Sequence, residues 1–292
     1  MDGMHYEGMI VRPPSEAEGV ILQVTVGCSH NKCTFCGTYK GTRFKIKDEA
    51  IIDADIRYAA KHLSFLRRVF LTDGDVLILP QQKLIWILNR IREELPWIQR
   101  VGVYGNTKAV LRKSPEELEE LRSLGLGVVY LGLESGHPDV LREIRKGQTP
   151  ERMVEAGRRV RAAGLKLSVT VLLGIAGRRL SLEHARATGE VLSAMDPNYV
   201  GALTLMVVPG TELADKVDAG EFDLLEPHEH LMELREMIRS TNLTQGLFLS
   251  NHASNYLPVK VRMPSGKEKA LELIDQAIAG NVRLKPEWMR AL

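Results

Sequence analysis

Cysteine is scarce in this chain of 292 residues, and the three cysteines that occur all lie between positions 28 and 36. A membrane-spanning helix needs about 18 consecutive apolar residues, and no apolar run in this sequence is that long. The first residues form neither a basic nor an apolar segment, so we expect no signal peptide and a cytoplasmic protein. An odd, clustered set of cysteines in such a protein argues against a disulfide framework and for a metal or redox site.

The sequence also lacks an excess of charge of either sign. Lysine and arginine number 39 and aspartate and glutamate 37, which gives a formal net charge of +2. This balance provides no electrostatic reason for tight binding to nucleic acid or to a membrane, so we expect a small-molecule substrate. Hydrophobic residues at 44% and charged residues at 26% are typical of a globular protein long enough for one β/α barrel or two small domains.

Short apolar runs rich in β-branched residues alternate with helical stretches over the first two thirds of the chain. This order predicts right-handed crossovers and a parallel sheet, although periodicity alone leaves a doubly wound sheet and a full or partial barrel open. The expected strands are Val20–Val26, Val69–Leu71, Val101–Tyr104, Val128–Leu133, Leu167–Leu173 and Val200–Met206. The expected helices between them are Glu49–Leu63, Gln81–Leu95, Pro115–Leu124, Pro138–Ile144, Pro150–Ala163 and Leu182–Ala194.

The pattern weakens after Met206. We expect a helix near Glu229–Arg239, a strand at Leu247–Ser250 and a last helix at about Lys267–Ala279.

The three cysteines, Cys28, Cys33 and Cys36, share one loop directly after the first expected strand. Cysteine thiolates are the usual ligands of iron–sulfur clusters, and a [4Fe–4S] cluster takes four of them. Three thiolates leave one iron open, and an open iron can bind a substrate directly. A structural zinc site normally has four ligands and would need His30 as well. Zinc, or three cysteines gathered by coincidence, are the alternatives.

This loop resembles the cluster loop of the radical SAM superfamily, whose usual signature is C-x3-C-x2-C with an aromatic residue before the last cysteine. Phe35 stands at the aromatic position. Residues 29–32 make the first gap four residues long, one more than the usual signature. The resemblance implies that the three cysteines hold a [4Fe–4S] cluster and that S-adenosylmethionine binds at its open iron.

Two more strand ends resemble cofactor contacts of that family. The segment Asp73-Gly74-Asp75 stands in the place of a Gly-Gly-Glu segment that receives the methionine ammonium group. By this resemblance Asp75 supplies the carboxylate, and Asp73 and Gly74 shape the turn. An ordinary Asp-Gly turn is the alternative. Asn106, at the end of the third expected strand, is a further candidate for the pocket lining.

The segment Gly132–Gly136 resembles the Gly-Leu-Glu-Ser-Gly element of the subgroup that includes the coproporphyrinogen dehydrogenases, methylthiotransferases and Elongator-type enzymes. The resemblance implies that Glu134 and Ser135 face the ribose and methionine parts of the cofactor and that Lys146 meets its carboxylate. A solvated helix face is the alternative for Lys146. Gly174 ends the fifth expected strand, where the family binds adenine; a buried strand followed by a glycine turn explains it equally well.

The C-terminal third contains a polar cluster after a short apolar run. We expect His252 and Tyr256 to be catalytic at the barrel mouth, with His252 as the acid–base group because histidine titrates near neutrality. The alternative is a loop held in place by its own asparagine side chains, such as that of Asn255.

Active sites of parallel β/α barrels lie at the C-terminal ends of the strands, where most of these elements fall. The resemblance extends from about Pro13 to Thr211. It implies an α/β fold in which residues 1–212 form a partial (β/α)6 TIM-like barrel of parallel strands, with the cluster loop at 27–37. Residues 213–292 would form a small C-terminal α/β extension that closes the barrel mouth.

The activity implied by the resemblance is radical chemistry. The enzyme would accept an electron from a flavodoxin or ferredoxin, cleave S-adenosylmethionine reductively to a 5′-deoxyadenosyl radical, and abstract hydrogen from a substrate that the sequence does not identify. Two alternatives belong to other classes: a carrier or chaperone that binds cluster and S-adenosylmethionine without turnover, and a zinc-binding α/β module.

Overall fold

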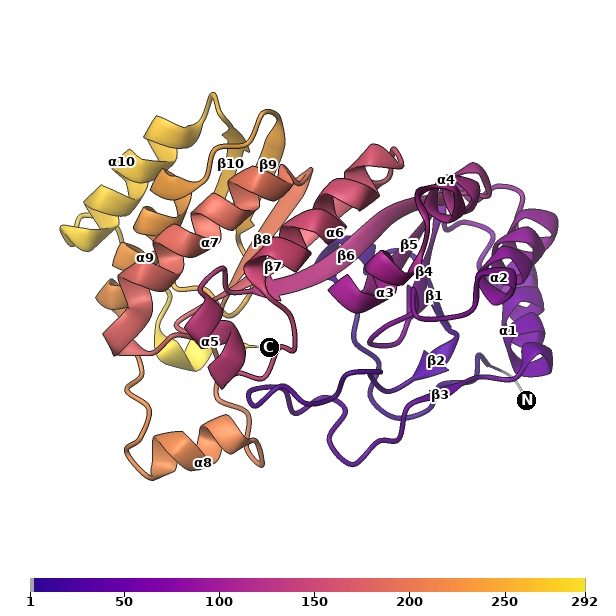
Figure 1. The fold of residues 1–292 in the computed structure, drawn as a ribbon, viewed down its shortest axis with the longest axis horizontal. Coiled ribbons are helices and arrows are strands. Elements are labelled where there is room, and N and C mark those ends of the chain that lie inside the picture. Colours follow the sequence, from indigo (N-terminus) through magenta and orange to yellow (C-terminus); the bar gives the residue numbers. More distant parts are fainter. Residues whose placement is uncertain (1–2, 292) are drawn as a thin grey trace. The chain divides into compact units, whose positions relative to one another are not determined.

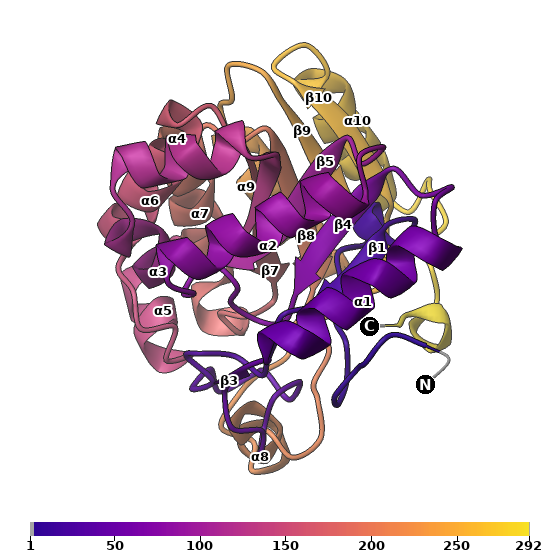
Figure 2. The same ribbon diagram turned by 90° about the vertical axis from the view of Figure 1, so that its right-hand side faces the viewer.

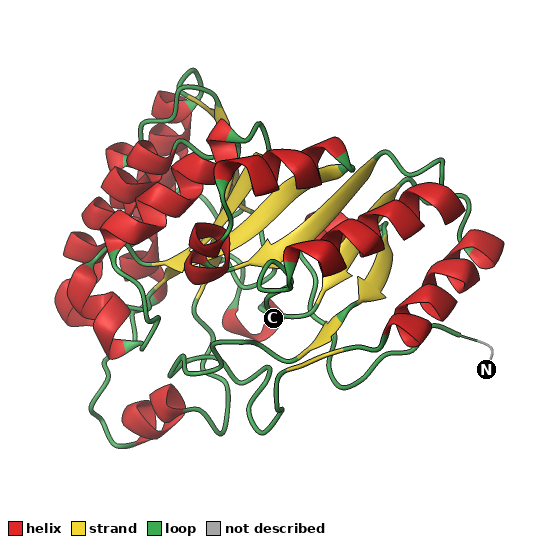
Figure 3. Cartoon of the chain, turned by 45° about the vertical axis from the view of Figure 1, so that its right-hand side comes forward, coloured by secondary structure: helices red, strands yellow, loops and turns green. Residues whose placement is uncertain are grey.

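The computed structural model describes residues 3–291, in which strands alternate with helices (Figure 1, Figure 3). Eight strands are hydrogen-bonded in the order β1-β4-β5-β6-β7-β8-β9-β10, and β2 pairs with β3 separately. The pairings β1–β4, β4–β5, β5–β6, β7–β8 and β8–β9 are parallel, whereas β9 and β10 are antiparallel. The strands are β1 (Val20–Gln23), β2 (Thr25–Val26), β3 (Lys45–Ile46), β4 (Arg68–Thr72), β5 (Arg100–Gly105), β6 (Leu126–Glu134), β7 (Lys166–Leu173), β8 (Tyr199–Thr204), β9 (Gly246–Ser250) and β10 (Val259–Met263).

The helices connect most of these strands. They are α1 (Glu49–His62), α2 (Gln81–Glu94), α3 (Thr107–Arg112), α4 (Pro115–Ser123), α5 (Pro138–Glu143), α6 (Pro150–Ala162), α7 (Ser181–Met195), α8 (Glu212–Asp218), α9 (Pro227–Ser240) and α10 (Lys267–Ile278). None of the helices within residues 3–291 is long and apolar enough to cross a membrane.

One compact unit, here called unit 1, consists of residues 1–31, 38–131 and 159–167. Its strands β1, β4 and β5 are parallel neighbours, and α1 packs against both β1 and α2 (Figure 2). Phe70 lies in the core of this unit, and its ring meets those of Tyr104 and Tyr130 edge-on at centroid distances of 4.9 and 5.6 Å. This aromatic cluster fixes the strands that carry the candidate site of unit 1.

A second compact unit, unit 2, consists of residues 32–37, 132–158 and 168–292. Its helices α7, α9 and α10 pack in series, with α9 in the middle (Figure 1). Apolar residues at helical spacing on α9, Leu234, Met237 and Ile238, are buried, which explains why this amphipathic segment forms a helix here. The predicted division of the chain at residue 212 stays a prediction.

Almost all of the expected elements occur within two residues of their predicted bounds. The single strand expected over Val20–Val26 is wrong, because the chain leaves the large sheet after Gln23. Thr25 and Val26 pair instead with β3 as an antiparallel ribbon. The prediction also missed β10, whose alternating exposed Lys260 and Arg262 obscure its buried apolar face.

Candidate functional site

The cysteine loop belongs to both compact units. Cys28 lies in unit 1, and Cys33 and Cys36 lie in unit 2, so each is described by its own surroundings. All three are half-buried thiols. Within residues 3–291 no set of three or more histidine, cysteine, aspartate or glutamate side chains is already arranged to hold a metal ion. The three-thiolate ligand set therefore stays a prediction.

Close contact between Cys28 and the loop after β4 depends on Gly74. A Cβ atom on Gly74 would lie 2.9 Å from the Cβ of Cys28 and 2.8 Å from the ring of Tyr39. Real Cβ atoms do not approach other heavy atoms that closely, so only glycine permits this packing. The segment Asp73-Gly74-Asp75 is thus held beside the first cysteine, and its contact with the methionine ammonium group stays a prediction.

Asp73 uses its carboxylate inside the protein. The Tyr39 hydroxyl donates to Oδ1, and the Gln23 side-chain amide and the Gly27 N–H donate to Oδ2 at 3.4 Å. Burial raises the pKa of Asp73, and these hydrogen bonds act in the opposite direction. Asp73 therefore ties Gly27, directly before Cys28, to Tyr39, two residues beyond the cluster loop, and its turn-shaping role stays a prediction.

Asp75 is fully buried but only partly paired. Its Oδ2 accepts hydrogen bonds from Ser29 Oγ at 2.5 Å and from Asn106 Nδ2 at 2.6 Å. Its Oδ1 is buried and accepts no hydrogen bond from the residues that the structure describes. Burial raises the pKa of Asp75 to about 6. A buried carboxylate oxygen without a donor suits an incoming cation such as an ammonium group.

Asn106 orients Asp75 and begins the next helix. Its Oδ1 accepts from the Ala109 N–H at 2.8 Å, which makes it the N-cap of α3. Its Nδ2 donates to Asp75 as described above. Both ends of the side chain are therefore engaged within the protein.

In unit 2 the cysteine loop is anchored through its backbone. The Thr34 N–H donates to the Ile144 carbonyl at 3.1 Å, and the Thr34 carbonyl accepts from the Leu213 N–H at 3.0 Å. The end of α5 and the start of α8 thus fix the segment between Cys33 and Cys36. Phe35 follows Thr34 and is half-buried.

Glu134 and Lys146, each expected to contact the cofactor separately, are paired with one another. The Lys146 ammonium lies 2.8 Å from Glu134 Oε1, and the two side chains are mostly buried. Glu134 also has a positive φ of 61°, a strained conformation for a residue other than glycine. The structure thus brings together two predicted site residues that are twelve positions apart in the sequence.

Ser135 and Gly174 each have a buried partner that sequence reasoning missed. His184 Nδ1 on α7 lies 2.7 Å from Ser135 Oγ, and its Nε2 lies 3.5 Å from Oε1 of Glu233 on α9. Glu233 in turn accepts from the Gly174 N–H at 2.7 Å and from the Ser181 hydroxyl. His184 Nε2 forms no hydrogen bond within the described residues, so His184 holds the segment after β6 and Glu233 holds the segment after β7 as close neighbours.

His184 and Glu233 are completely buried, and their pKa values move in opposite directions. Burial raises the pKa of Glu233 to about 7 and lowers the pKa of His184 to about 3. The signal that could have revealed Glu233 is a charged residue within the buried stripe of α9, between Leu231 and Leu234.

Glycine is the only residue type that position 174 accepts. Its φ is +83°, and a Cβ there would lie 2.5 Å from Cε1 of His230. Its N–H is occupied by Glu233, so the turn after β7 is fixed from the side of α9.

His252 and Tyr256 lie together on the segment after β9, and both have partners inside the protein. His252 Nδ1 lies 2.9 Å from Ser254 Oγ, and burial lowers the pKa of His252. The Tyr256 hydroxyl donates to Glu287 at 2.5 Å and accepts from Arg290 at 2.6 Å. Burial, together with the bond to Glu287, raises the pKa of Tyr256 to about 12.

The expected alternative for this segment, a loop held by its own asparagine, has direct structural support. Asn255 donates to the Ala202 carbonyl at 2.9 Å and accepts from Thr204 Oγ1 at 2.7 Å. The loop is therefore fastened to β8. Catalytic roles for its histidine and tyrosine stay predictions.

A comparison with protein families identifies the class. The family model described as the radical SAM superfamily matches residues 22–186, which is more than half of the chain. The chain belongs to the radical SAM superfamily. Its membership implies a [4Fe–4S] cluster and S-adenosylmethionine as cofactors, and radical SAM enzymes need a reductant.

Individual relatives are distant. The chain is 23% identical over 288 residues to the uncharacterized methyltransferase PH0819 of Pyrococcus horikoshii, covering 92% of this chain and 59% of the relative. A tRNA uridine(34) acetyltransferase of Methanocaldococcus infernus is 27% identical over 111 residues, which cover 37% of this chain and 21% of that protein. The chain thus spans about three fifths of the first relative and a much smaller part of the second.

The fold is shared with a solved radical SAM enzyme. Coproporphyrinogen III oxidase HemN from Escherichia coli superimposes with a TM-score of 0.56 at 15% identity, covering 76% of this chain and 51% of HemN. Together with the mainly parallel eight-stranded sheet, this likeness confirms the predicted α/β class and is consistent with a partial TIM barrel.

Proposed function

We propose that this chain is an enzyme that cleaves S-adenosylmethionine reductively and uses the resulting radical to take a hydrogen atom from a small-molecule substrate. The observation that carries the proposal is the buried Oδ1 of Asp75, which has no donor within the described residues and belongs to a loop packed against Cys28. When bound, the cluster supplies one electron to the sulfonium compound. The protein supplies the ligands, the binding contacts and the exclusion of water.

The residues of unit 1 have distinct roles in this proposal. Cys28 is one cluster ligand, with Cys33 and Cys36 as the other two. Asp75 accepts the methionine ammonium group through Oδ1. Asn106 and Ser29 hold the other oxygen of Asp75, so that the carboxylate does not have to reorganise when the ammonium group binds. Asp73 and Gly74 keep this loop against Cys28.

The residues of unit 2 bind the remainder of the cofactor. We assign the ribose and methionine carboxylate to the Glu134–Lys146 pair, whose lysine offers a cation and whose glutamate offers an acceptor. Ser135 and Gly174 form the walls beside it and are held by His184 and Glu233. Phe35 provides apolar cover next to the last cysteine. The short match to a tRNA uridine(34) acetyltransferase supports a place in the Elongator-like subgroup for this radical SAM portion only.

The segment after β9 faces the substrate in this proposal. His252 is the proposed acid–base group for a substrate proton, and burial, which lowers its pKa, favours the neutral imidazole. Tyr256 shapes the wall, because its hydroxyl is already engaged by Glu287 and Arg290. A cytoplasmic flavodoxin or ferredoxin is the proposed electron donor.

The test is an anaerobic assay for 5′-deoxyadenosine with reconstituted protein, dithionite and S-adenosylmethionine. Wild-type protein should form the product, and Cys33→Ala protein should not. Binding of S-adenosylmethionine without product would indicate the carrier or chaperone instead. Zinc in place of iron and sulfide after reconstitution would overturn the proposal.

A further inference from the structure

Residues 5–11, here called the strap, form an irregular segment of unit 1 that precedes the part of the chain matched by the family model. The roles proposed above involve none of these residues. Tyr6 and Met9 are 47% and 68% exposed, so the strap lies at the surface of the protein. A surface segment without secondary structure is usually poorly ordered unless it is tied down, and the strap is tied down at three points.

The first tie is a buried ion pair at the start of the strap. The His5 N–H donates to Oδ1 of Asp55 at 2.7 Å, and the His5 carbonyl accepts from the Lys47 ammonium at 2.5 Å. Asp55 on α1 and Lys47 directly after β3 are almost completely buried, and their charged groups lie 3.4 Å apart. The strap backbone is therefore held here by charge-assisted hydrogen bonds that salt screens only weakly.

The other two ties meet the C-terminal ends of β1 and β4. The Glu7 N–H donates to Oε1 of Gln23 at 2.8 Å, and the Gln23 amide donates back to the Glu7 carbonyl at 3.0 Å. The Val11 carbonyl accepts from Thr72 Oγ1 at 3.2 Å. Gln23 and Thr72 are completely buried and are register partners in the parallel pair β1–β4. The strap therefore contacts both strands at the level at which each of them ends.

Gln23 transmits this restraint to Asp73. The amide nitrogen that binds Glu7 also donates to Oδ2 of Asp73 at 3.4 Å, and Thr72 directly precedes Asp73. The same Asp73 oxygen accepts from the Gly27 N–H. A side-chain amide has two hydrogens, so Gln23 can bind the strap and Asp73 at the same time. The strap is thus connected to Asp73 through one buried, neutral side chain.

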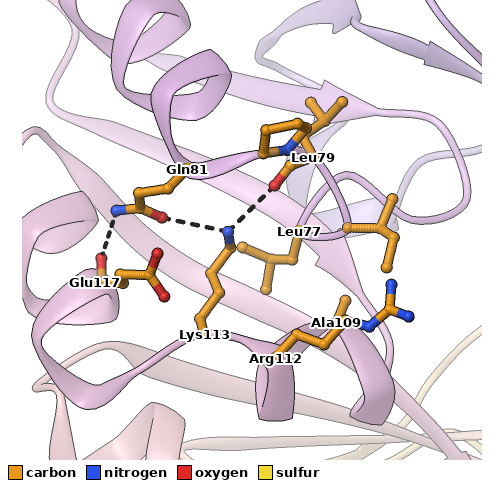
Figure 4. A pocket seen from close by; sticks show the side chains of 9 residues that line it. Leu77, Leu79, Gln81, Ala109, Arg112, Lys113 and Glu117 are labelled. Carbon is orange, nitrogen blue, oxygen red and sulfur yellow. Dashed lines mark hydrogen bonds between the residues drawn. The ribbon is translucent and has the colours of Figure 1, made fainter.

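The opposite end of the segment after β4 has restraints of its own. The Lys113 ammonium donates to the Leu79 carbonyl and to Oε1 of Gln81, both at 3.2 Å (Figure 4). The Val76 N–H donates to the Tyr104 carbonyl at 3.0 Å. These contacts begin at Val76, so the strap acts through Gln23 on a part of the segment that they leave out.

We propose that the strap is a positioning element for residues 73–75, here called the aspartate loop. Its backbone keeps Gln23 in the orientation that donates to Asp73, and Asp73 keeps the loop beside Gly27. If the strap bond is lost, Oε1 of Gln23 is buried without its donor, which favours another orientation of the side chain. The consequence for cofactor binding rests on the proposed function, in which Asp75 of this loop receives the ammonium group of S-adenosylmethionine.

The experiment compares two variants at position 7. Glu7→Pro removes the N–H that donates to Gln23 and Glu7→Gln retains it, whereas both remove the ion pair with Lys45. The first readout is backbone hydrogen exchange of the cluster-loaded full chain under anaerobic conditions. Exchange of the Gly27 and Asp73 amides should be about tenfold faster in Glu7→Pro than in wild-type protein or Glu7→Gln, and exchange within β5 should not change.

The second readout is the affinity for S-adenosylmethionine, measured by anaerobic calorimetry. The affinity should fall about three- to tenfold in Glu7→Pro and keep its wild-type value in Glu7→Gln. Wild-type protein that does not bind S-adenosylmethionine would overturn the proposed function, and the exchange rates would still decide the role of the strap. Equal exchange rates in the two variants would overturn the strap proposal even with cofactor binding intact.

Gly8 provides a second pair of variants if the proline variant does not fold. Its φ is +71°, and a Cβ placed there meets no atom within 4 Å, so a substitution acts through the strap backbone alone. Gly8→Val should accelerate exchange at Asp73, because a β-branched residue resists this conformation. Gly8→Asn should restore slow exchange, because asparagine tolerates it. Equal exchange at Asp73 in these two variants would also contradict the role of the strap.

Discussion

The two compact units use buried carboxylates in opposite ways. In unit 1, Asp75 has one oxygen fixed by Ser29 and Asn106 and one buried oxygen without a donor among residues 3–291. In unit 2, both oxygens of Glu233 accept hydrogen bonds, from Gly174 and Ser181. A half-paired carboxylate is prepared for a ligand, whereas a fully paired one holds other residues in place. Burial alone therefore does not distinguish the two carboxylates, whereas the unfilled hydrogen-bonding position of Asp75 Oδ1 does.

The largest effect should come from the cysteine loop, on which both units depend. Cys33→Ala should abolish the visible iron–thiolate absorption of the reconstituted protein, since three thiolates are the minimum for the proposed cluster. Lys32→Ala, an exposed neighbour in the same loop, is the control and should retain the absorption. Full iron and sulfide content in the Cys33 variant would remove that residue from the ligand set.

The next effect tests the half-paired carboxylate itself. Asp75→Asn should weaken binding of S-adenosylmethionine about 10- to 100-fold, because a charge-assisted hydrogen bond to an ammonium group is lost, while the cluster absorption persists. Glu134→Gln should weaken it less, since the charge of Glu134 is already matched by Lys146. Anaerobic calorimetry of both variants measures the contrast. Equal losses, or a larger loss for Glu134, would reverse the proposed division of roles.

Glu233, the fully paired carboxylate, should affect the free energy of unfolding instead of cofactor binding. The pKa of Glu233 is raised to about 7 from an ordinary value of 4.5. The unfolded chain therefore releases this proton at lower pH than the folded protein does. The contribution of Glu233 to the free energy of unfolding is fully present below pH 4.5 and is lost as the pH rises through about 7. The loss is on the order of 3 kcal/mol.

Glu233→Gln should remove this dependence. Urea unfolding of wild-type and variant protein between pH 5 and about pH 8 should show the free energies of unfolding diverging as the pH rises, in favour of the variant. The control is Glu236→Gln, one turn along α9 and ion-paired with Arg186 and Arg239. Parallel pH curves for wild type and Glu233→Gln would mean that Glu233 does not carry the buried proton.

The smallest effect concerns the segment after β9. Tyr256→Phe should lower the free energy of unfolding by about 1 kcal/mol, through loss of the bonds to Glu287 and Arg290, and should leave formation of 5′-deoxyadenosine unchanged. Denaturant unfolding and the product assay are compared on one preparation. Normal stability with lost substrate conversion would instead make the tyrosine catalytic, as first expected from the sequence.

More of the fold than of the candidate site could be predicted from the sequence. Alternating apolar runs and helical stretches predicted nearly all elements of the sheet, because hydrophobic periodicity is a local property. The position of Asp73 to Asp75 directly after a strand was also predictable, whereas their contact with the cofactor stays a prediction. The close approach of His184 to Glu233 was not, because the two residues are far apart in sequence and meet only when α7 packs on α9. No local pattern could show that Oδ1 of Asp75 has no donor among residues 3–291.

The glycine at position 74 has a consequence for protein engineering. Any substitution there must separate Cys28 from the aspartate loop by the width of a methyl group or more. If the proposed roles hold, a library that varies position 74 will therefore be rich in proteins that lose cluster assembly and cofactor binding at once.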